Sequence, residues 1–235
     1  MTVPLIRWQV DGPYEVAFST RLGGVSTGPF ASLNLGRLTA DGPRNADENR
    51  RRLCEAVGVK GEDLAMNRQV HGAMVNRASA GTRGQPGDGL WTDEPGMPML
   101  VFTADCLPIA LARRNGRPAL ALLHAGRMGL LEGIVEAGVA ALGGPVTAVV
   151  GPGIGPCCYE VSEEIASTYR ARFGEHVAPQ RHLDLWTAAE QLLHAADVEQ
   201  VDRLDLCTAC HAERFFSHRR DEGTTGRQGV IGFVT

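Results

Sequence analysis

The sequence predicts a single domain of mixed α+β class that spans residues 1–235. Short apolar runs bounded by turn residues are typical of buried strands. Between them lie segments with capping residues and one apolar face, which are typical of helices. The chain is 43% hydrophobic over 235 residues, which suits one large core that needs no cross-links. Strands and helices interleave without a repeat period, and this pattern predicts sheets packed with helices.

The first half of the chain shows a strand, a helix and a loop. Tyr14–Arg21 is rich in strand-forming residues and is followed by glycines that indicate a turn. Ala46–Gly58 is expected to be a helix, because acidic residues lie near its start and Gly58 can end it. Arg77–Gly89 is rich in glycine and is expected to be a loop.

The second half alternates strands and helices. The expected strands are Met99–Phe102, Ile109–Arg113, Ala119–His124, Val146–Gly151 and Arg203–Thr208. The expected helices are Gly129–Gly144, a helix capped by Ser162, and Leu185–Ala196 capped by Asp184. The order of the strands within the sheets stays open.

Charge argues against nucleic acid or an anionic membrane as a partner, because the net charge is −4. The basic residues are uneven, since Lys60 is the only lysine and the other 22 are arginines. A mechanism that uses a lysine nucleophile is therefore disfavoured. We expect any bound anion to contact arginine, histidine or backbone N–H groups.

The N-terminus has no basic segment followed by a long apolar stretch, and no apolar run approaches the ~20 residues of a membrane span. We therefore expect a cytoplasmic protein whose six cysteines are reduced thiols. A cytoplasmic cysteine is a metal ligand, a nucleophile or a small buried side chain. The oligomeric state stays open.

Three residues form a candidate metal and catalytic site: His71, Cys106 and His124. His124 ends the apolar run ALALLH, where ligand sites of open sheets collect. Cys106 lies at an expected turn between two strands, and His71 lies at a strand end or in a loop before Gly72. A thiolate and two imidazoles suit a catalytic zinc ion with one position left for water or substrate. Structural histidines and a buried thiol are the alternative.

Two further cysteine motifs are less informative. CTACH, from Cys207 to His211, matches the pattern of covalent haem attachment, but that chemistry belongs to exported proteins. The pair could also be half of a zinc site, yet no second C-x-x-C exists. Adjacent cysteines bind one metal poorly, so Cys157 and Cys158 are expected to be thiols packed under the GPGIGP loop. That loop lacks the register of a phosphate-binding glycine motif.

A basic segment lies near the C-terminus, where FFSHRRDEGTTGRQG contains Arg219, Arg220 and Arg227. A solvated charged turn is the favoured interpretation. Contact with an anion or with the edge of a substrate is the alternative.

Nine segments, in one order along the chain, resemble a known family. They are FSTRLGGVS, SLNLG, NRQVHG, DGLWTD, TADCLPI, HAG, GPGIGPCCYEV, LDLW and FFSHRRD with TGRQG. Together they extend from about Phe18 to Gly232. They resemble the multicopper polyphenol oxidase, or laccase-domain, family, which is also described as a zinc-dependent purine nucleoside phosphorylase family. Some bacterial members are called peptidoglycan editing factor.

The resemblance implies that His71, Cys106 and His124 are zinc ligands at the catalytic site. It implies a fold similar to that of a bacterial toxin deamidase, with mixed sheets packed between helices. It also implies phosphorolysis of adenosine, inosine, guanosine and methylthioadenosine, with purine nucleosides and phosphate as partners, and deamination of adenosine. Copper with oxidase activity is a further possibility that the family's name implies.

Three residues are candidates for binding phosphate or nucleoside. Arg21 ends an expected strand beside flexible glycines, and it is the first candidate for phosphate. Asn34 is a candidate for a ribose hydroxyl or the base. The family usually continues HAG with Trp-Arg-Gly, whereas this chain has Arg127, Met128 and Gly129. Arg127 is thus one position early, and we expect it to point in a different direction.

Two alternatives use the same metal-site residues. In a hydrolase that edits misloaded peptidoglycan precursors, Cys106 would be a nucleophile and His124 its base. In a non-enzymatic zinc-binding module, the ion would only stabilise the fold. The three-ligand set argues against the module, because structural zinc sites usually have four protein ligands.

Overall fold

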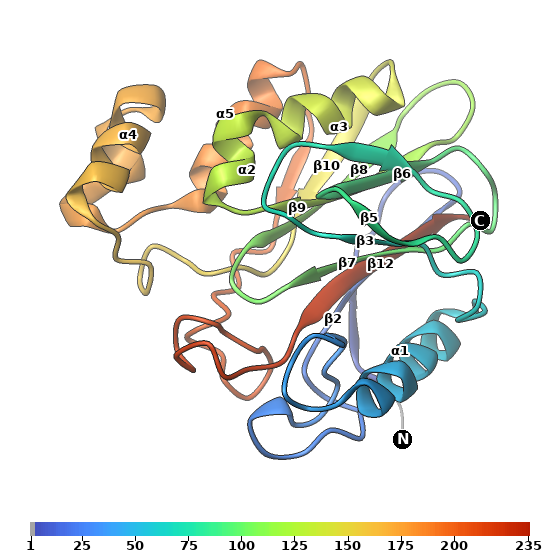
Figure 1. The fold of residues 1–235 in the computed structure, drawn as a ribbon. Helices are drawn as coiled ribbons and strands as arrows, with labels where there is room; N and C mark the ends of the chain where they lie inside the picture. Colours follow the sequence, from blue (N-terminus) through green and yellow to red (C-terminus); the bar gives the residue numbers. More distant parts are fainter. Residues whose placement is uncertain (1–2) are drawn as a thin grey trace.

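Two β-sheets pack face to face at the centre of the protein, and helices cover the outer face of each (Figure 1). The structure is a computed structural model, and it describes residues 3–235. The result is an α–β–β–α arrangement of layers. This confirms the predicted mixed class, with sheets between helices.

The larger sheet has six strands in the order β11-β10-β8-β9-β6-β4. The four inner strands pair antiparallel, while β11 and β4 add parallel edges. Its central strands are buried on both faces, which explains their continuous apolar sequences. The strand bounds are β4 Val75–Arg77, β6 Gly89–Thr92, β8 Leu107–Arg113, β9 Leu120–Ala125, β10 Val146–Val150 and β11 Val201–Arg203.

The smaller sheet has four antiparallel strands in the order β1-β2-β12-β7. A separate parallel pair joins β3 to β5. The bounds are β1 Leu5–Arg7, β2 Tyr14–Ser19, β3 Met66–Arg68, β5 Arg83–Pro86, β7 Met99–Thr103 and β12 Gln228–Val234.

Helices α2, α3 and α5 cover the six-stranded sheet, and α1 covers the four-stranded sheet (Figure 1). Along β8, Ile109 and Leu111 pack with the helices, while Ala110 and Ala112 pack with the other sheet. The bounds are α1 Pro43–Val57, α2 Arg127–Glu132, α3 Ile134–Leu142, α4 Glu163–Phe173 and α5 Leu185–Ala195, with short 3-10 turns at Gly28–Phe30, Glu175–Val177 and Pro179–Arg181.

Three predicted elements need correction. The helix predicted over 129–144 is two helices, because Gly133 takes a left-handed conformation with φ of 95°. The strand predicted over 203–208 lies earlier in the chain, because β11 ends at Arg203. Asp205 has a left-handed backbone conformation with φ of 48°, which does not continue a strand. The loop predicted over 77–89 contains the exposed strand β5. The other predicted strands and helices are present, with ends shifted by a few residues.

Within residues 3–235, no helix combines the length and the apolar character needed to cross a membrane.

Candidate metal centre and active site

The antiparallel register of the six-stranded sheet brings three chain segments to one edge. The end of β9 lies beside the start of β8, with His124 opposite Pro108. β6 also runs antiparallel to β9 and starts at Gly89, opposite Leu123. The residues that immediately precede β8 and β6 therefore meet the end of β9. Cys106 and the loop before β4 reach the same edge.

Two residues at this edge have left-handed backbone conformations. The φ angle is 85° at Asp105, directly before Cys106, and 64° at His71. Such values are uncommon outside glycine and concentrate at functional sites. The Asp105 carboxylate accepts hydrogen bonds from Thr208 Oγ1 at 2.6 Å and from the Arg219 N–H at 2.7 Å. These contacts hold the turn that presents Cys106.

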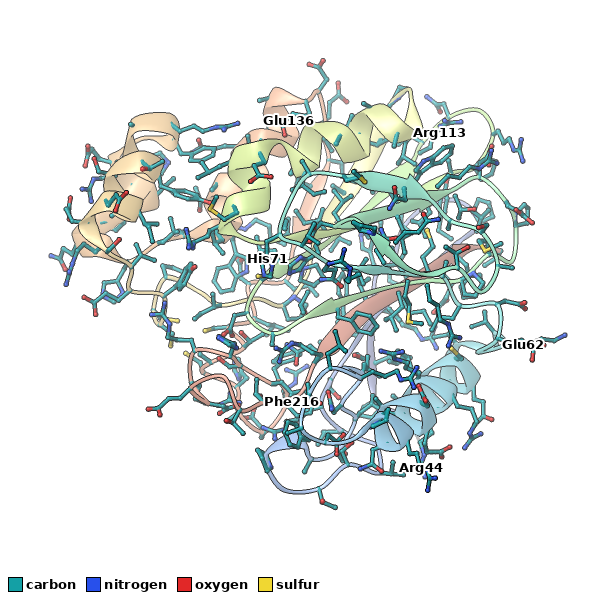
Figure 2. All side chains as sticks on the ribbon, viewed as in Figure 1. Arg44, Glu62, His71, Arg113, Glu136 and Phe216 are labelled. Carbon is teal, nitrogen blue, oxygen red and sulfur yellow. The ribbon has the colours of Figure 1, made fainter. Side chains whose placement is uncertain are left out.

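The structure brings together the three residues predicted to form the site. The ligand atoms of His71, Cys106 and His124 all lie within 4.8 Å of one another. The two imidazole rings meet edge to face, with centroids 4.9 Å apart, and His71 lies beside α2 (Figure 2). His124 is buried, Cys106 is half-buried and His71 is exposed, so one side of the group is open.

Asp88 is a site residue that the sequence did not reveal. Its Oδ1 lies 2.8 Å from Nδ1 of His124 and accepts the N–H of His71 at 2.9 Å. Its Oδ2 accepts the N–H groups of Val70 at 3.0 Å and Gly72 at 2.8 Å. Burial raises the pKa of Asp88, but these hydrogen bonds outweigh burial and lower it. The ionised carboxylate thus orients His124 and fixes the loop that carries His71.

Cys106 and His124 favour opposite charges. Burial opposes ionisation of the Cys106 thiol, but His124 and His71 outweigh burial and lower the pKa of Cys106 to about 6. Burial also opposes protonation of His124, but Cys106 and Asp88 raise the pKa of His124 to about 9. At neutral pH the geometry therefore favours a thiolate beside an imidazolium.

The residues present fit a transition-metal ion. A Cβ atom on Gly126 would lie 2.9 Å from Cys106 Sγ and 3.4 Å from Cδ2 of His71, so this glycine leaves the space beside them free. One thiolate and two imidazoles are suitable ligands. In metal sites, a carboxylate commonly accepts a hydrogen bond from the second ring nitrogen of a ligating histidine and fixes the orientation of the ring, as Asp88 does here for His124. His71, Cys106 and His124 can thus hold a metal, with positions left for other ligands.

The three residues line a cleft of about 930 Å³, a size typical of small-molecule sites. Apolar and aromatic side chains cover part of its wall: Met66, Phe102, Met128, Tyr159 and Leu185. Seven arginines also line it: Arg37, Arg50, Arg68, Arg83, Arg127, Arg219 and Arg227. Such a cleft suits a ligand with an apolar ring and an anionic group.

Of the candidates for binding phosphate or nucleoside, some line the cleft and others lie outside its lining. Arg127, the first residue of α2, lines the cleft. Arg219 and Arg227 line it as well, which favours an anion contact over a solvated turn. Arg220 instead binds the Asp221 carboxylate with Nε at 2.7 Å and Nη2 at 2.8 Å.

Arg21 and Asn34 are not among the residues that line the cleft. The Arg21 guanidinium donates to the carbonyl oxygens of Ala31 at 2.7 Å and Ala212 at 2.8 Å, and it covers the Phe216 ring. The Asn34 side chain is buried, and its Oδ1 accepts the Arg227 N–H at 2.9 Å. Both side chains form these hydrogen bonds within the fold, and the structure places neither of them at the cleft.

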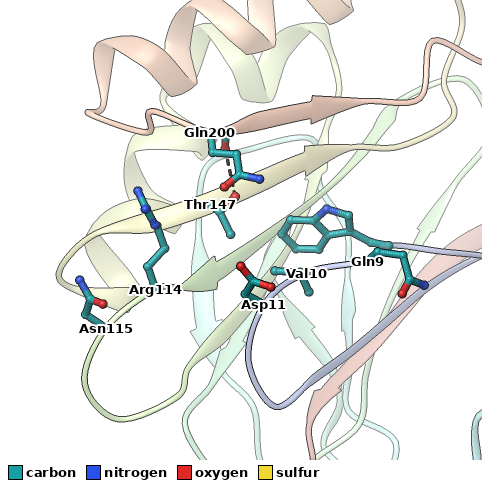
Figure 3. Close-up of a pocket in the computed structure, with 8 residues that line it drawn as sticks. Gln9, Val10, Asp11, Arg114, Asn115, Thr147 and Gln200 are labelled. Carbon is teal, nitrogen blue, oxygen red and sulfur yellow. Dashed lines mark hydrogen bonds between the residues drawn. The ribbon is translucent and has the colours of Figure 1, made fainter.

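A second, smaller pocket of about 340 Å³ lies elsewhere on the molecule (Figure 3). Trp8, Asp11 and Arg114 are among its lining residues, and Thr147 Oγ1 donates to the carbonyl of Gln200 at 3.2 Å. The metal-site residues do not line it, so we place the chemistry in the larger cleft.

Known proteins resemble this chain over nearly its whole length. A purine nucleoside phosphorylase of Deinococcus radiodurans is 42% identical over 228 residues, which cover 92% of this chain and 88% of that protein. Purine nucleoside phosphorylase YfiH of Escherichia coli (strain K12) is 37% identical, with 94% of each chain covered.

Solved structures share the fold. YlmD from Geobacillus stearothermophilus superposes with a TM-score of 0.86 at 32% identity, over 98% of this chain and 99% of that one. The Bacillus licheniformis hypothetical protein YfiH superposes with a TM-score of 0.89 at 27% identity, over 97% and 98%. The family described as multi-copper polyphenol oxidoreductase laccase matches residues 15–234. The chain therefore belongs to this laccase-domain family.

Proposed function

We propose that the protein is a zinc-dependent purine nucleoside phosphorylase that also deaminates adenosine. The observation that carries this proposal is the convergence of His71, Cys106 and His124 in a cleft lined by arginines. The names of the relatives support it, because several curated members at 33–42% identity are called purine nucleoside phosphorylase. Adenosine, inosine, guanosine and methylthioadenosine are the substrates to test.

His71, Cys106 and His124 would hold the zinc ion, and Asp88 would keep the His124 ring in position. Bound zinc supplies Lewis acidity, which activates water near neutral pH. The Asp88 carboxylate accepts from Nδ1 of His124, so Nε2 is the nitrogen that remains for the metal. Deamination of adenosine consumes water and gives inosine and ammonia.

Phosphorolysis requires phosphate close to the ribose, and we assign that anion to Arg127 with support from Arg219 and Arg227. All three line the cleft, and guanidinium groups bind phosphate oxygens through paired hydrogen bonds. Phosphate then attacks C1′ of the ribose while the C1′–N9 bond breaks, which gives ribose 1-phosphate and the free base. The apolar side chains of the cleft, including Phe102 and Tyr159, suit the purine ring.

Metal analysis and product analysis on the same preparation test the proposal. Purified protein is incubated with adenosine, with and without phosphate. We expect the purified protein to contain bound zinc. Adenine and ribose 1-phosphate should form only in the reaction that contains phosphate, whereas inosine should form in both reactions. Zinc-loaded protein that leaves adenosine unchanged in both reactions contradicts the proposal. Stoichiometric copper with oxidation of a phenol supports the copper oxidase instead.

One observation favours a second candidate, a hydrolase with Cys106 as nucleophile. The lowered pKa of Cys106 and its contact with His124 are the features of an activated thiolate. A peptidoglycan precursor carrying a wrong amino acid would be the substrate. Activity on such a precursor that survives removal of zinc would favour this candidate, since a thiolate bound to zinc is a poor nucleophile. Both the metal site and the nucleophile require Cys106 in its reduced form. Because thiols stay reduced in the cytoplasm, we place the protein there.

A further inference from the structure

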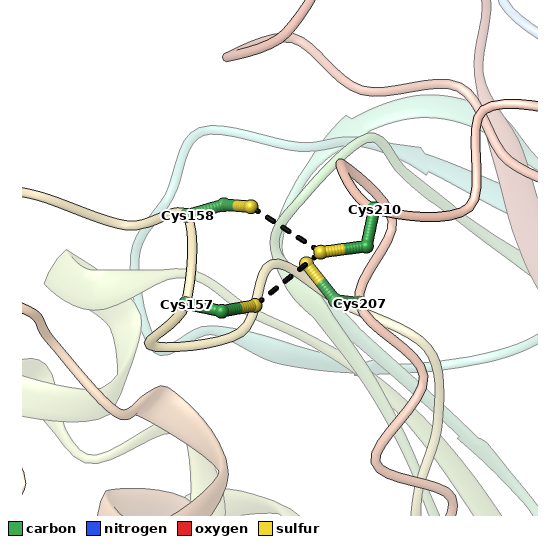
Figure 4. Close-up of side chains that lie close together, drawn as sticks. All are labelled: Cys157, Cys158, Cys207 and Cys210. Atoms are coloured by element: carbon green, nitrogen blue, oxygen red, sulfur yellow. Dashed lines mark hydrogen bonds between the residues drawn. The ribbon is translucent and has the colours of Figure 1, made fainter.

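Two pairs of cysteines that lie far apart in the sequence meet in two adjacent loops. Cys157 and Cys158 lie between β10 and α4, whereas Cys207 and Cys210 follow β11. Their four sulfur atoms all lie within 4.8 Å of one another (Figure 4). Cys210 Sγ is 3.5 Å from Cys157 Sγ and 3.4 Å from Cys158 Sγ. These distances exceed the ~2.05 Å of a disulfide bond, so the four groups are thiols in contact.

This arrangement corrects the expectation that the adjacent pair is packed beneath the GPGIGP loop. Cys157 and Cys210 are exposed and Cys158 is half-buried, while Cys207 is buried. The partner of the Cys207–Cys210 pair is thus the adjacent pair Cys157–Cys158, and not a second C-x-x-C. Both adjacent sulfurs point toward Cys210 (Figure 4).

Backbone contacts hold the two loops side by side. Gly153 forms a parallel bridge with Cys207, its N–H donates to the carbonyl of Leu206 at 3.2 Å, and its carbonyl accepts the Thr208 N–H at 3.0 Å. The N–H of Gly155 points at the Cys207 sulfur, 3.3 Å away. A backbone donor aimed at sulfur stabilises a thiolate. The loops therefore place the four sulfurs before any ligand binds.

The spacing of the sulfurs fits a single metal ion. Four thiolates around one tetrahedral zinc ion at ~2.3 Å lie ~3.8 Å from each other. The sulfurs here are separated by 3.4 Å, 3.5 Å and at most 4.8 Å. A four-iron cluster needs more space, because each cysteine then binds a different iron.

We propose that Cys157, Cys158, Cys207 and Cys210 bind one structural zinc ion, separate from the site at His71. Four protein ligands close the coordination sphere, which is the arrangement of structural zinc sites. Tetrahedral coordination by four sulfurs selects zinc among the common divalent ions. The site does not depend on the proposed enzymatic activity.

The zinc would connect two loops that shape the catalytic cleft. Tyr159, which lines the cleft, directly follows Cys158. Thr208, which follows Cys207, donates to the Asp105 carboxylate at 2.6 Å. Asp105 in turn precedes Cys106 in its left-handed turn. Cross-linking the loops thus stabilises the turn that presents Cys106.

The test is the zinc content of the full chain, purified under reducing conditions without chelator. We expect about two zinc ions per chain, one for each site. Cys210→Ser and Cys158→Ser should each lose one zinc ion, and His71→Ala should lose the other. His211→Ala is the matched control, because His211 adjoins Cys210 and pairs with Glu213 outside the cluster. The control should keep both zinc ions.

A second measurement covers variants that fold poorly. Cobalt(II) is added to metal-free His71→Ala, in which the four cysteines are intact. The absorption spectrum should show tetrahedral cobalt bound by four thiolates, and Cys210→Ser added to this variant should abolish it. Native zinc content in both serine variants would overturn the proposal, and so would one equivalent of iron in place of the second zinc. A mass lower by two hydrogen atoms, with a Cys157–Cys210 disulfide in fresh protein, would also overturn it.

Discussion

The Asp88 carboxylate lies 2.8 Å from Nδ1 of His124, and both side chains are buried, with exposed fractions of 0% for Asp88 and 4% for His124. Because the same carboxylate accepts the backbone N–H of His71, one buried charge positions two of the three proposed ligands. The third ligand, Cys106, depends on Asp105, which is held by Thr208 and Arg219. Two aspartates outside the proposed ligand set thus support the site, Asp88 through His71 and His124 and Asp105 through Cys106.

Asp88→Asn should weaken zinc binding, because the amide NH2 group that replaces one carboxylate oxygen cannot accept the backbone N–H groups of the loop that carries His71. The amide lacks the charge that holds the His124 ring, and loss of such a partner costs about 10- to 100-fold in metal affinity. Competition with a chelator measures the dissociation constant of the cleft zinc. Asp93→Asn is the matched control, since Asp93 pairs with Arg77 and Arg117 on the surface. Equal affinity in the two variants contradicts the role given to Asp88.

His71→Ala, Cys106→Ala and His124→Ala should each contain one zinc ion fewer than the unchanged protein and lose both proposed activities. Each change removes a ligand from a site with three protein ligands. Elemental analysis measures the loss, and circular dichroism checks the fold. His176→Ala, whose ring contacts Gln191 away from the cleft, should keep its zinc. Full zinc in all three alanine variants would rule out the ligand assignment.

Arg127→Ala should raise the KM for phosphate about 10- to 100-fold, because hydrogen bonds to charged groups contribute roughly 1.5–3 kcal/mol. Deamination of adenosine does not use phosphate and should change much less. Paired assays of ribose 1-phosphate from inosine and inosine from adenosine separate these effects. Arg21→Ala is the control, and it should lower the Tm without a selective effect on phosphate, because Arg21 binds backbone carbonyls. The reverse pattern would restore Arg21 as the phosphate ligand.

The stability contributed by Asp221 should depend on pH. Burial opposes ionisation of Asp221, but hydrogen bonds from Arg220 and Thr225 outweigh it and lower the pKa. A carboxylate with a lowered pKa stabilises the fold above the unfolded value of ~3.9, and this contribution is lost as the pH falls through the folded value.

Asp221→Asn should therefore reduce the free energy of unfolding by about 1 kcal/mol at pH 7, and the difference should shrink below pH ~4. Urea denaturation at pH 7, 5 and 3 measures it. Asp11→Asn, a change at an exposed carboxylate, serves as the control and should have little effect at each pH. A constant difference across this range would mean that the charge of Asp221 is not its source.

Local sequence predicted much of the fold. The apolar runs of β8, β9 and β10 are visible because these strands are buried on both faces. Ser162 and Asp184 cap α4 and α5 as expected, with bonds to Ile165 and Thr187, because a cap acts over one helical turn. By contrast, β12 was not predicted, and its pairing with β2 and β7 depends on residues more than a hundred positions away.

The residue types of the proposed metal site were also visible in the sequence, since a histidine that ends an apolar run, a cysteine at an expected turn and a second histidine before a glycine suit metal ligands. Only the tertiary structure decided that they converge, because the register of β9 with β8 and β6 brings their ends to one edge. The role of Asp88, which lies between two glycines, depends on the same register. The choice of Arg127 over Arg21 also required the tertiary structure, which places Arg127 at the cleft and Arg21 outside its lining.

The four-cysteine cluster shows the same division. Sequence supplied two pairs of cysteines and no spacing that relates them, because about fifty residues separate Cys157 from Cys207. A local sequence pattern spans only a few residues, so it cannot relate partners that lie this far apart in the chain. The bridge between Gly153 and Cys207 aligns the two loops, and a contact of this kind exists only after the sheets and helices have packed.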